Sequence, residues 1–140
     1  MLLVLLLRIN AVLFALFGIA FVLQPAEMAH ILTGTFPQTA SALTDMRATY
    51  GGIPLGFAAF LGWAGFTRQA ERTAGLAVLL VLAGLALGRV VGILVDGSLN
   101  AIITALLLSE LLGVALMAAA LKRPFTMALR GSLQSPRQQQ

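Results

Sequence analysis

Residues that could do chemistry gather in one stretch, Asp45–Gly56, and at two distant positions. The stretch combines an acid, a base, a phenol, three glycines and a proline at the start of a long apolar run. Arg89 and Glu110 each lie inside an apolar run of their own. Ionisable side chains in such runs are costly to bury, at ~2.5–3.5 kcal/mol each near a bilayer centre, so they are candidates for function.

Two kinds of chemistry fit these residue types, and a third interpretation is structural. Arginines bind phosphate and carboxylate groups, so Arg47 and Arg89 above Glu110 would suit an anionic head group. A buried carboxylate could instead act as a proton donor or acceptor. Alternatively, Arg89 and Glu110 could pair only to fix the register of two helices. The sequence leaves these alternatives open.

The composition is that of an integral membrane protein. Hydrophobic residues make up 59% and charged residues 10% of the 140 residues, against ~45–50% and ~25% in soluble domains. About 20 residues of helix cross the ~30 Å apolar layer of a bilayer. Four runs meet that length: 2–23, 47–66, 75–95 and 99–121. We therefore predict an all-α, four-transmembrane-helix bundle in residues 1–123, followed by a cytoplasmic tail in 124–140.

Several function classes are not expected. The net charge of +4 could suggest nucleic acid, but no basic face with interleaved aromatic residues is found. The chain has no cysteine, and His30 is its one histidine, so we expect neither a thiolate site nor a metal site. No cofactor is expected.

The bases predict the topology. Six of them fall on one side of the predicted bundle, whereas the other side holds three acids, with Arg47 at its edge. The positive-inside rule then places both termini in the cytoplasm. A cleaved signal peptide is the alternative for the first run. Its length, the lack of a basic N-terminal region and the presence of Arg8 and Asn10 argue for a retained helix.

The connections and helix starts carry further signals. Pro25–Leu32 is predicted to form a short helix on the membrane surface, because Pro25 suits the first helical turn. The following Gly, Pro, Ser and Thr residues predict irregular chain up to the second run. Thr44 or Asp45 is the expected N-cap of that run, and Ser98 that of the fourth. Pro54 is expected to kink the second helix.

Small residues predict where helices approach closely. Gly52 and Gly56 form a small-xxx-small pair, and a second set at four-residue spacing comprises Gly84, Gly88 and Gly92. We expect another helix against each. The short loop at 67–73 predicts that the second and third runs are antiparallel neighbours. Asn10, inside the first run, is expected to bond to another helix.

Depth then predicts an ion pair. Arg89 lies seven residues before Asp96, or about 10 Å from the outer end of its helix. Glu110 lies ten residues after Asn100, or about 15 Å from the same end. The two residues thus differ in depth by about 5 Å. A long arginine side chain can span this difference, so we predict an Arg89–Glu110 ion pair. The predicted polar cluster around it comprises Arg47, Tyr50, Gly51, Gly52, Arg89, Asp96 and Glu110.

The sequence also resembles a known family. The phrase in residues 47–56, then Gly88-Arg89-Val90-Val91-Gly92 with Asp96-Gly97, then a lone Glu110, is similar to a family of small bacterial four-helix membrane proteins. That family is catalogued as a domain of unknown function and looks distantly DoxX-like. The resemblance covers roughly residues 5–122. It implies a four-helix fold in the bacterial inner membrane and points at the cluster named above, but it brings no activity.

The leading hypothesis is a binding or accessory membrane protein with an outward-facing polar pocket. Its ligand would be a membrane lipid or another amphipathic molecule, or a partner membrane protein. One alternative is an integral membrane enzyme with Glu110 or Asp96 as acid/base and Arg89 beside it. Others are a proton-coupled transporter or channel working as a homo-oligomer, and a purely structural subunit of a membrane complex.

Overall fold

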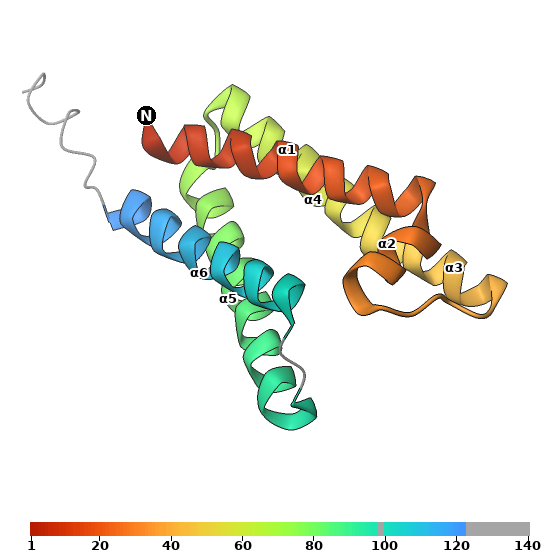
Figure 1. The fold of residues 1–140 in the computed structure, drawn as a ribbon. Helices are drawn as coiled ribbons and strands as arrows, with labels where there is room; N and C mark the ends of the chain where they lie inside the picture. The colour runs from red at the N-terminus through yellow and green to blue at the C-terminus, as the bar shows by residue number, and fades with distance from the viewer. Residues whose placement is uncertain (98–99, 123–140) are drawn as a thin grey trace, which may run out of the picture.

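The computed structural model describes residues 1–97 and 100–122. Within these residues the chain is all-α (Figure 1). Three helices, α1, α5 and α6, are long and apolar enough to cross a membrane. The elements in order are α1 (Leu2–Leu23), α2 (Pro25–Thr33), α3 (Ala40–Met46), the π-helical segment η1 (Arg47–Gly52), α4 (Ile53–Thr67), α5 (Glu71–Asp96) and α6 (Ala101–Lys122).

The long helices form two hairpins that share one core. Helix α1 packs along η1 and α4, whereas α5 packs chiefly on α6. The shared core lies where the start of α1, the end of α4, the start of α5 and the end of α6 meet, around Leu7, Leu61, Val78 and Met117. Away from this end the hairpins diverge (Figure 1). The prediction that the second and third runs pack as antiparallel neighbours is therefore wrong beyond their connection, because α4 lies along α1 instead.

The second run begins earlier than predicted. Its helix starts at Ala40, and Thr39 is the N-cap, with Oγ1 accepting a hydrogen bond from the Ala42 N–H at 3.1 Å. The predicted caps Thr44 and Asp45 are already inside the helix, so this part of the expected irregular chain is helical. The surface-helix prediction corresponds to α2, which ends at Gly34 in the left-handed conformation.

Pro54 distorts the second run, as predicted, but the distortion is a π-helical turn rather than a simple kink. Ile53 N–H bonds to Ala48 O, five residues back. Pro54 follows within the first turn of α4, and its missing N–H cannot extend an ordinary i→i−4 ladder across this point. A helix of 15 residues, α4, continues from there. The second predicted span is thus a composite of α3, η1 and α4.

The start of α6 is capped by Asn100, whose Oδ1 accepts the Ile103 N–H at 2.9 Å. The predicted cap at Ser98 and the predicted start at Leu99 lie outside the described residues. The predicted cytoplasmic tail, residues 124–140, lies outside them too.

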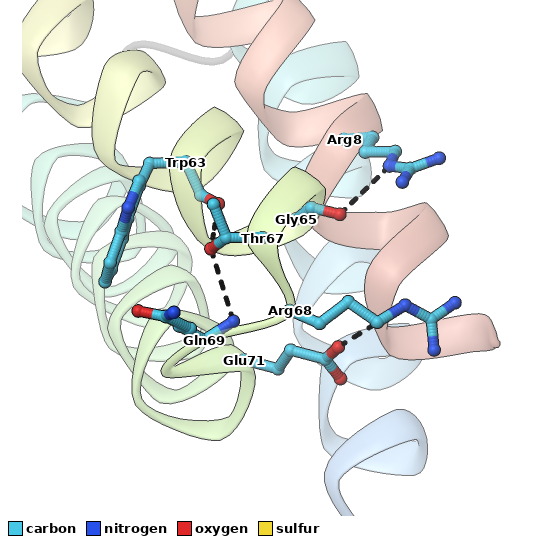
Figure 2. A network of polar contacts seen from close by, with 7 residues as sticks. All are labelled: Arg8, Trp63, Gly65, Thr67, Arg68, Gln69 and Glu71. Atoms are coloured by element: carbon cyan, nitrogen blue, oxygen red, sulfur yellow. Dashed lines mark hydrogen bonds and ion pairs between the residues drawn. The ribbon is translucent and has the colours of Figure 1, made fainter.

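Three arginines each donate a hydrogen bond to a backbone carbonyl in the C-terminal turn of a helix other than their own: Arg8, Arg47 and Arg72. Arg8 Nε donates to Gly65 O at the end of α4, at 3.1 Å (Figure 2). The Arg8 guanidinium also lies 4.7 Å from the centroid of the Phe66 ring. Arg72 Nη2 donates to Leu121 O at the end of α6, at 3.1 Å. The last four carbonyls of a helix lack partners within it and attract cations. Backbone carbonyls at helix ends therefore provide hydrogen-bond partners for arginines that lie in or near the apolar runs of the sequence.

Asn10 departs from its prediction for a related reason. Its Nδ2 donates to Leu6 O in its own helix at 2.9 Å, rather than to another helix. A backbone carbonyl one turn back is always within reach of a helical polar side chain. The amide is therefore satisfied without a partner from another helix.

Candidate ligand-binding site

The predicted polar cluster falls into two groups on different hairpins. Arg47, Tyr50, Gly51 and Gly52 lie in η1, which packs against α1 and α4. Arg89 and Asp96 lie on α5, and Glu110 lies on α6. Because the hairpins diverge at this end (Figure 1), the structure does not bring η1 over the Arg89–Glu110 pair.

The predicted ion pair between Arg89 and Glu110 is confirmed. Arg89 Nε lies 2.8 Å from Glu110 Oε1 and 3.0 Å from Oε2. The Glu110 side chain is 6% exposed and that of Arg89 is 28% exposed. The two helices pack together along their length, which places residues of matching depth opposite each other. The pair satisfies the most deeply buried charge in the described part of the chain.

Arg89 keeps hydrogen-bonding capacity beyond this pair. A guanidinium has five N–H donors, four of them on Nη1 and Nη2. Among the described residues, only Nε of Arg89 forms a hydrogen bond. The remaining donors belong to a side chain that lines a cavity of about 220 Å³ between the end of α5 and the start of α6.

That cavity has one basic, one acidic and several apolar contributors. Its lining residues are Arg89, Gly92, Ile93, Asp96 and Ile103. Gly92 leaves its wall open, since a Cβ there would meet only Asp96 Oδ2, at 3.7 Å. Within the described residues, Asp96 forms no ion pair within 4 Å. The arrangement can offer both donors and an acceptor to the polar end of a molecule.

The η1 residues have mainly structural contacts. Arg47 Nε donates to Val22 O in the last turn of α1 at 3.0 Å, as Arg8 and Arg72 do elsewhere. The Tyr50 ring packs 5.2 Å from that of Phe21 and is 48% exposed. Gly51 is buried, and a Cβ there would lie 2.6 Å from Val22 Cγ2.

The helix contacts predicted at the spaced glycines are not made by the described residues of this chain. A Cβ at Gly56 would meet nothing within 4 Å, and one at Gly52 only Arg47 O at 3.9 Å. Gly84 and Gly88 likewise face open space, and Gly92 faces only Asp96. Close contacts occur instead at five other glycines: Gly18, Gly51, Gly65, Gly75 and Gly113. Gly18, which sequence reasoning overlooked, is the single glycine of the first apolar run, and that isolation is a usable signal.

We expect Arg47→Ala to lower the free energy of unfolding by about 1 kcal/mol through loss of its bond to Val22 O. It should leave the α5–α6 cavity unaffected, because Arg47 lies on the other hairpin. The free energy of unfolding in detergent tests the expected loss of stability. The occupancy of the cavity by ligand, measured on the same sample, tests whether binding is unaffected. Loss of occupancy without loss of stability would instead place Arg47 in the binding site.

The part of the chain that the structure describes contains no cluster of three or more His, Asp or Glu residues able to hold a metal ion. The described ion pairs are Arg89–Glu110 and the looser Arg68–Glu71, at 3.9 Å (Figure 2). The chemistry of the candidate site therefore rests on Arg89, Asp96 and the apolar walls between them.

Comparison with known proteins identifies a family without an activity. Searches of the curated proteins and of the solved structures find no match for this chain. A family model described as a domain of unknown function, DUF4345, matches residues 2–121. This range includes all of the α5 and α6 residues that form the candidate site. The chain belongs to this family of unknown function.

Proposed function

We propose that this protein binds a lipid-like, amphipathic molecule, with the polar end of the ligand in the cavity at Arg89 and Asp96. The observation that supports this most concerns Arg89, which lines the 220 Å³ cavity and is already paired with Glu110. Its Nη–H donors form no hydrogen bond with any described residue. The apolar walls at Ile93 and Ile103 would contact the ligand's hydrocarbon part. Such a mixture of apolar walls and few polar groups is typical of small-molecule sites.

The setting of this proposal is a four-span bundle in the inner membrane of a bacterium. The helix from Ala40 to Thr67 would be the fourth span, beside α1, α5 and α6. The distribution of lysine and arginine supports placing both termini in the cytoplasm, and the cavity then opens toward the outer leaflet. The distant likeness to the DoxX-like group belongs to the same proposal.

An alternative role is docking of a partner membrane protein or a second copy. The exposed glycines Gly84 and Gly88 on α5 favour it, because they leave a flat face for another helix. The enzyme and proton-transport alternatives have less support, since Arg89 Nε contacts both carboxylate oxygens of Glu110. A carboxylate so engaged is poorly placed to exchange a proton with a substrate.

The test is occupancy of the cavity by a co-purifying amphiphile. We expect Gly92→Leu to fill the cavity without touching the ion pair, since nothing but Asp96 lies within 4 Å of its Cβ position. Native mass spectrometry of protein extracted in mild detergent should show bound amphiphile in the wild type. In Gly92→Leu its occupancy should fall about tenfold, equivalent to ~1.4 kcal/mol.

Gly88→Leu is the matched control. It adds the same side chain to the same helix one turn away, at another glycine with open space around it, and Gly88 does not line the cavity. Occupancy should be unchanged in this variant. Equal occupancy in all three proteins would overturn the proposal.

A further inference from the structure

The charge balance of the α5–α6 cavity restricts the head group that it can hold. Glu110 already neutralises Arg89 through contacts to both carboxylate oxygens. Asp96 then adds one negative charge to the cavity wall, with no ion-pair partner among the described residues. The three charges sum to −1. A purely anionic head group would therefore meet net repulsion, whereas complementary charges favour binding.

The cavity nevertheless has a place for an anionic group at one end. The Nη–H donors of Arg89 have no hydrogen-bond partner among the described residues, and guanidinium groups bind phosphate oxygens through such donors. Asp96 lies seven residues further along α5, about 10 Å away on the same helical face. Both side chains line the same cavity. The wall thus has a donor pole at Arg89 and an acceptor pole at Asp96.

The lining also distinguishes between two kinds of cationic group. Quaternary ammonium groups are recognised by aromatic cages, and none of the described residues that line this cavity is aromatic. A primary ammonium has three N–H donors and can bond directly to a carboxylate such as Asp96. The chemistry therefore favours a primary amine over a trimethylated one.

We infer that the cavity selects a zwitterionic phospholipid head group with a primary amine, of the phosphoethanolamine type. The phosphate would lie at Arg89 and the ammonium group at Asp96. This inference rests on the proposed function and names its ligand class. The acyl chains would leave from the phosphate at Arg89 in the direction away from Asp96, along the apolar surface of α5 where Leu85 and Leu87 are exposed.

The test compares three lipids that differ only in head group. Detergent-solubilised full-length protein is mixed with equimolar phosphatidylethanolamine, phosphatidylcholine and phosphatidylglycerol, and bound lipids are counted by native mass spectrometry. We expect about a tenfold preference for phosphatidylethanolamine over each of the others. Water-soluble phosphoethanolamine at the same concentration should not displace the lipid, because it lacks the acyl chains; displacement would instead identify a free phosphoamine as the ligand and overturn the lipid inference.

Variants separate failure of this inference from failure of the proposed function. Asp96→Asn should remove the preference for the amine lipid while total lipid binding persists. Gly92→Leu should lower the binding of all three lipids about tenfold. Equal binding of the three lipids by the wild type, or preference for phosphatidylglycerol, would overturn the head-group inference alone, provided that Gly92→Leu still loses them. If Gly92→Leu retains all three, both the site and the inference are wrong.

Discussion

Arg89→Leu is expected to lower the free energy of unfolding by about 3–5 kcal/mol, because it leaves the Glu110 carboxylate buried without a counter-charge. Glu110→Leu should cost less. The Arg89 side chain is 28% exposed against 6% for Glu110, so a stranded Arg89 can reach water or the interface more readily. Reversible unfolding in detergent micelles, followed by circular dichroism, measures both losses.

The double variant Arg89→Leu/Glu110→Leu completes the cycle. Replacing both members of a buried pair with apolar residues is often neutral, so we expect it to recover most of the loss caused by Arg89→Leu. Ser109→Ala is the control on α6, since Ser109 is exposed and its hydroxyl bonds only to Leu106 O. It should change stability by no more than about 0.5 kcal/mol. Losses that simply add in the double variant would show that the pair has no net coupling.

The same double variant separates stability from binding. If it folds as well as the wild type but carries no amphiphile, Arg89 serves the ligand in addition to pairing with Glu110. If it folds and retains the amphiphile at full occupancy, the ion pair only fixes the register of α5 and α6. Arg89 would then have no role in the proposed site.

The long elements could be predicted from sequence because apolar runs of about 20 residues have few other structures available in a bilayer. The Arg89–Glu110 pair could be predicted too. Because the connection between α5 and α6 is short, residues at equal distances from it lie opposite each other on the two helices. A buried charge is costly unless an opposite charge lies beside it. The prediction of the helices and the prediction of the ion pair both follow from the types of the side chains and their spacing along the chain.

The positions of the other arginines could not be predicted in the same way. Arg8, Arg47 and Arg72 all bond to backbone carbonyls, and every residue has a carbonyl. A sequence therefore carries no signal for which helix end an arginine will reach. The position of Arg47 in the sequence therefore predicts that it belongs to the polar cluster, whereas in the structure its side chain bonds to a carbonyl in the last turn of α1.

Glycine spacing was misleading for a similar reason. A glycine shows that a close approach is permitted, but the partner helix is chosen by packing elsewhere. Because α4 lies along α1, Gly51 is used for contact while Gly52 and Gly56 face outward. The divergence of the two hairpins likewise leaves Gly84 and Gly88 without a neighbour among the described residues.

The crossing of α1 and η1 makes Gly18 and Gly51 sensitive to a single methyl group. A Cβ at Gly18 would lie 2.8 Å from Gly51 O, a backbone atom, and 2.8 Å from Leu55 Cγ. A Cβ at Gly51 would lie 2.6 Å from Val22 Cγ2 and 3.2 Å from Val22 N. We expect Gly18→Ala and Gly51→Ala each to cost about 1–3 kcal/mol of unfolding free energy, as overpacking does. Gly18→Ala should be the worse, since a backbone carbonyl cannot rotate away.

Gly52→Ala is the matched comparison, because it adds the same methyl group one residue along the same π-helical segment. Its Cβ would meet only Arg47 O at 3.9 Å, so the substitution should be neutral or gain about 0.5–1 kcal/mol from reduced backbone freedom. Unfolding of the three variants in the same detergent measures the contrast. A Gly52→Ala protein that unfolds normally but loses its bound amphiphile would show that a ligand or another chain occupies the exposed face of η1. Equal losses of stability at Gly51 and Gly52 would contradict the α1–η1 packing itself.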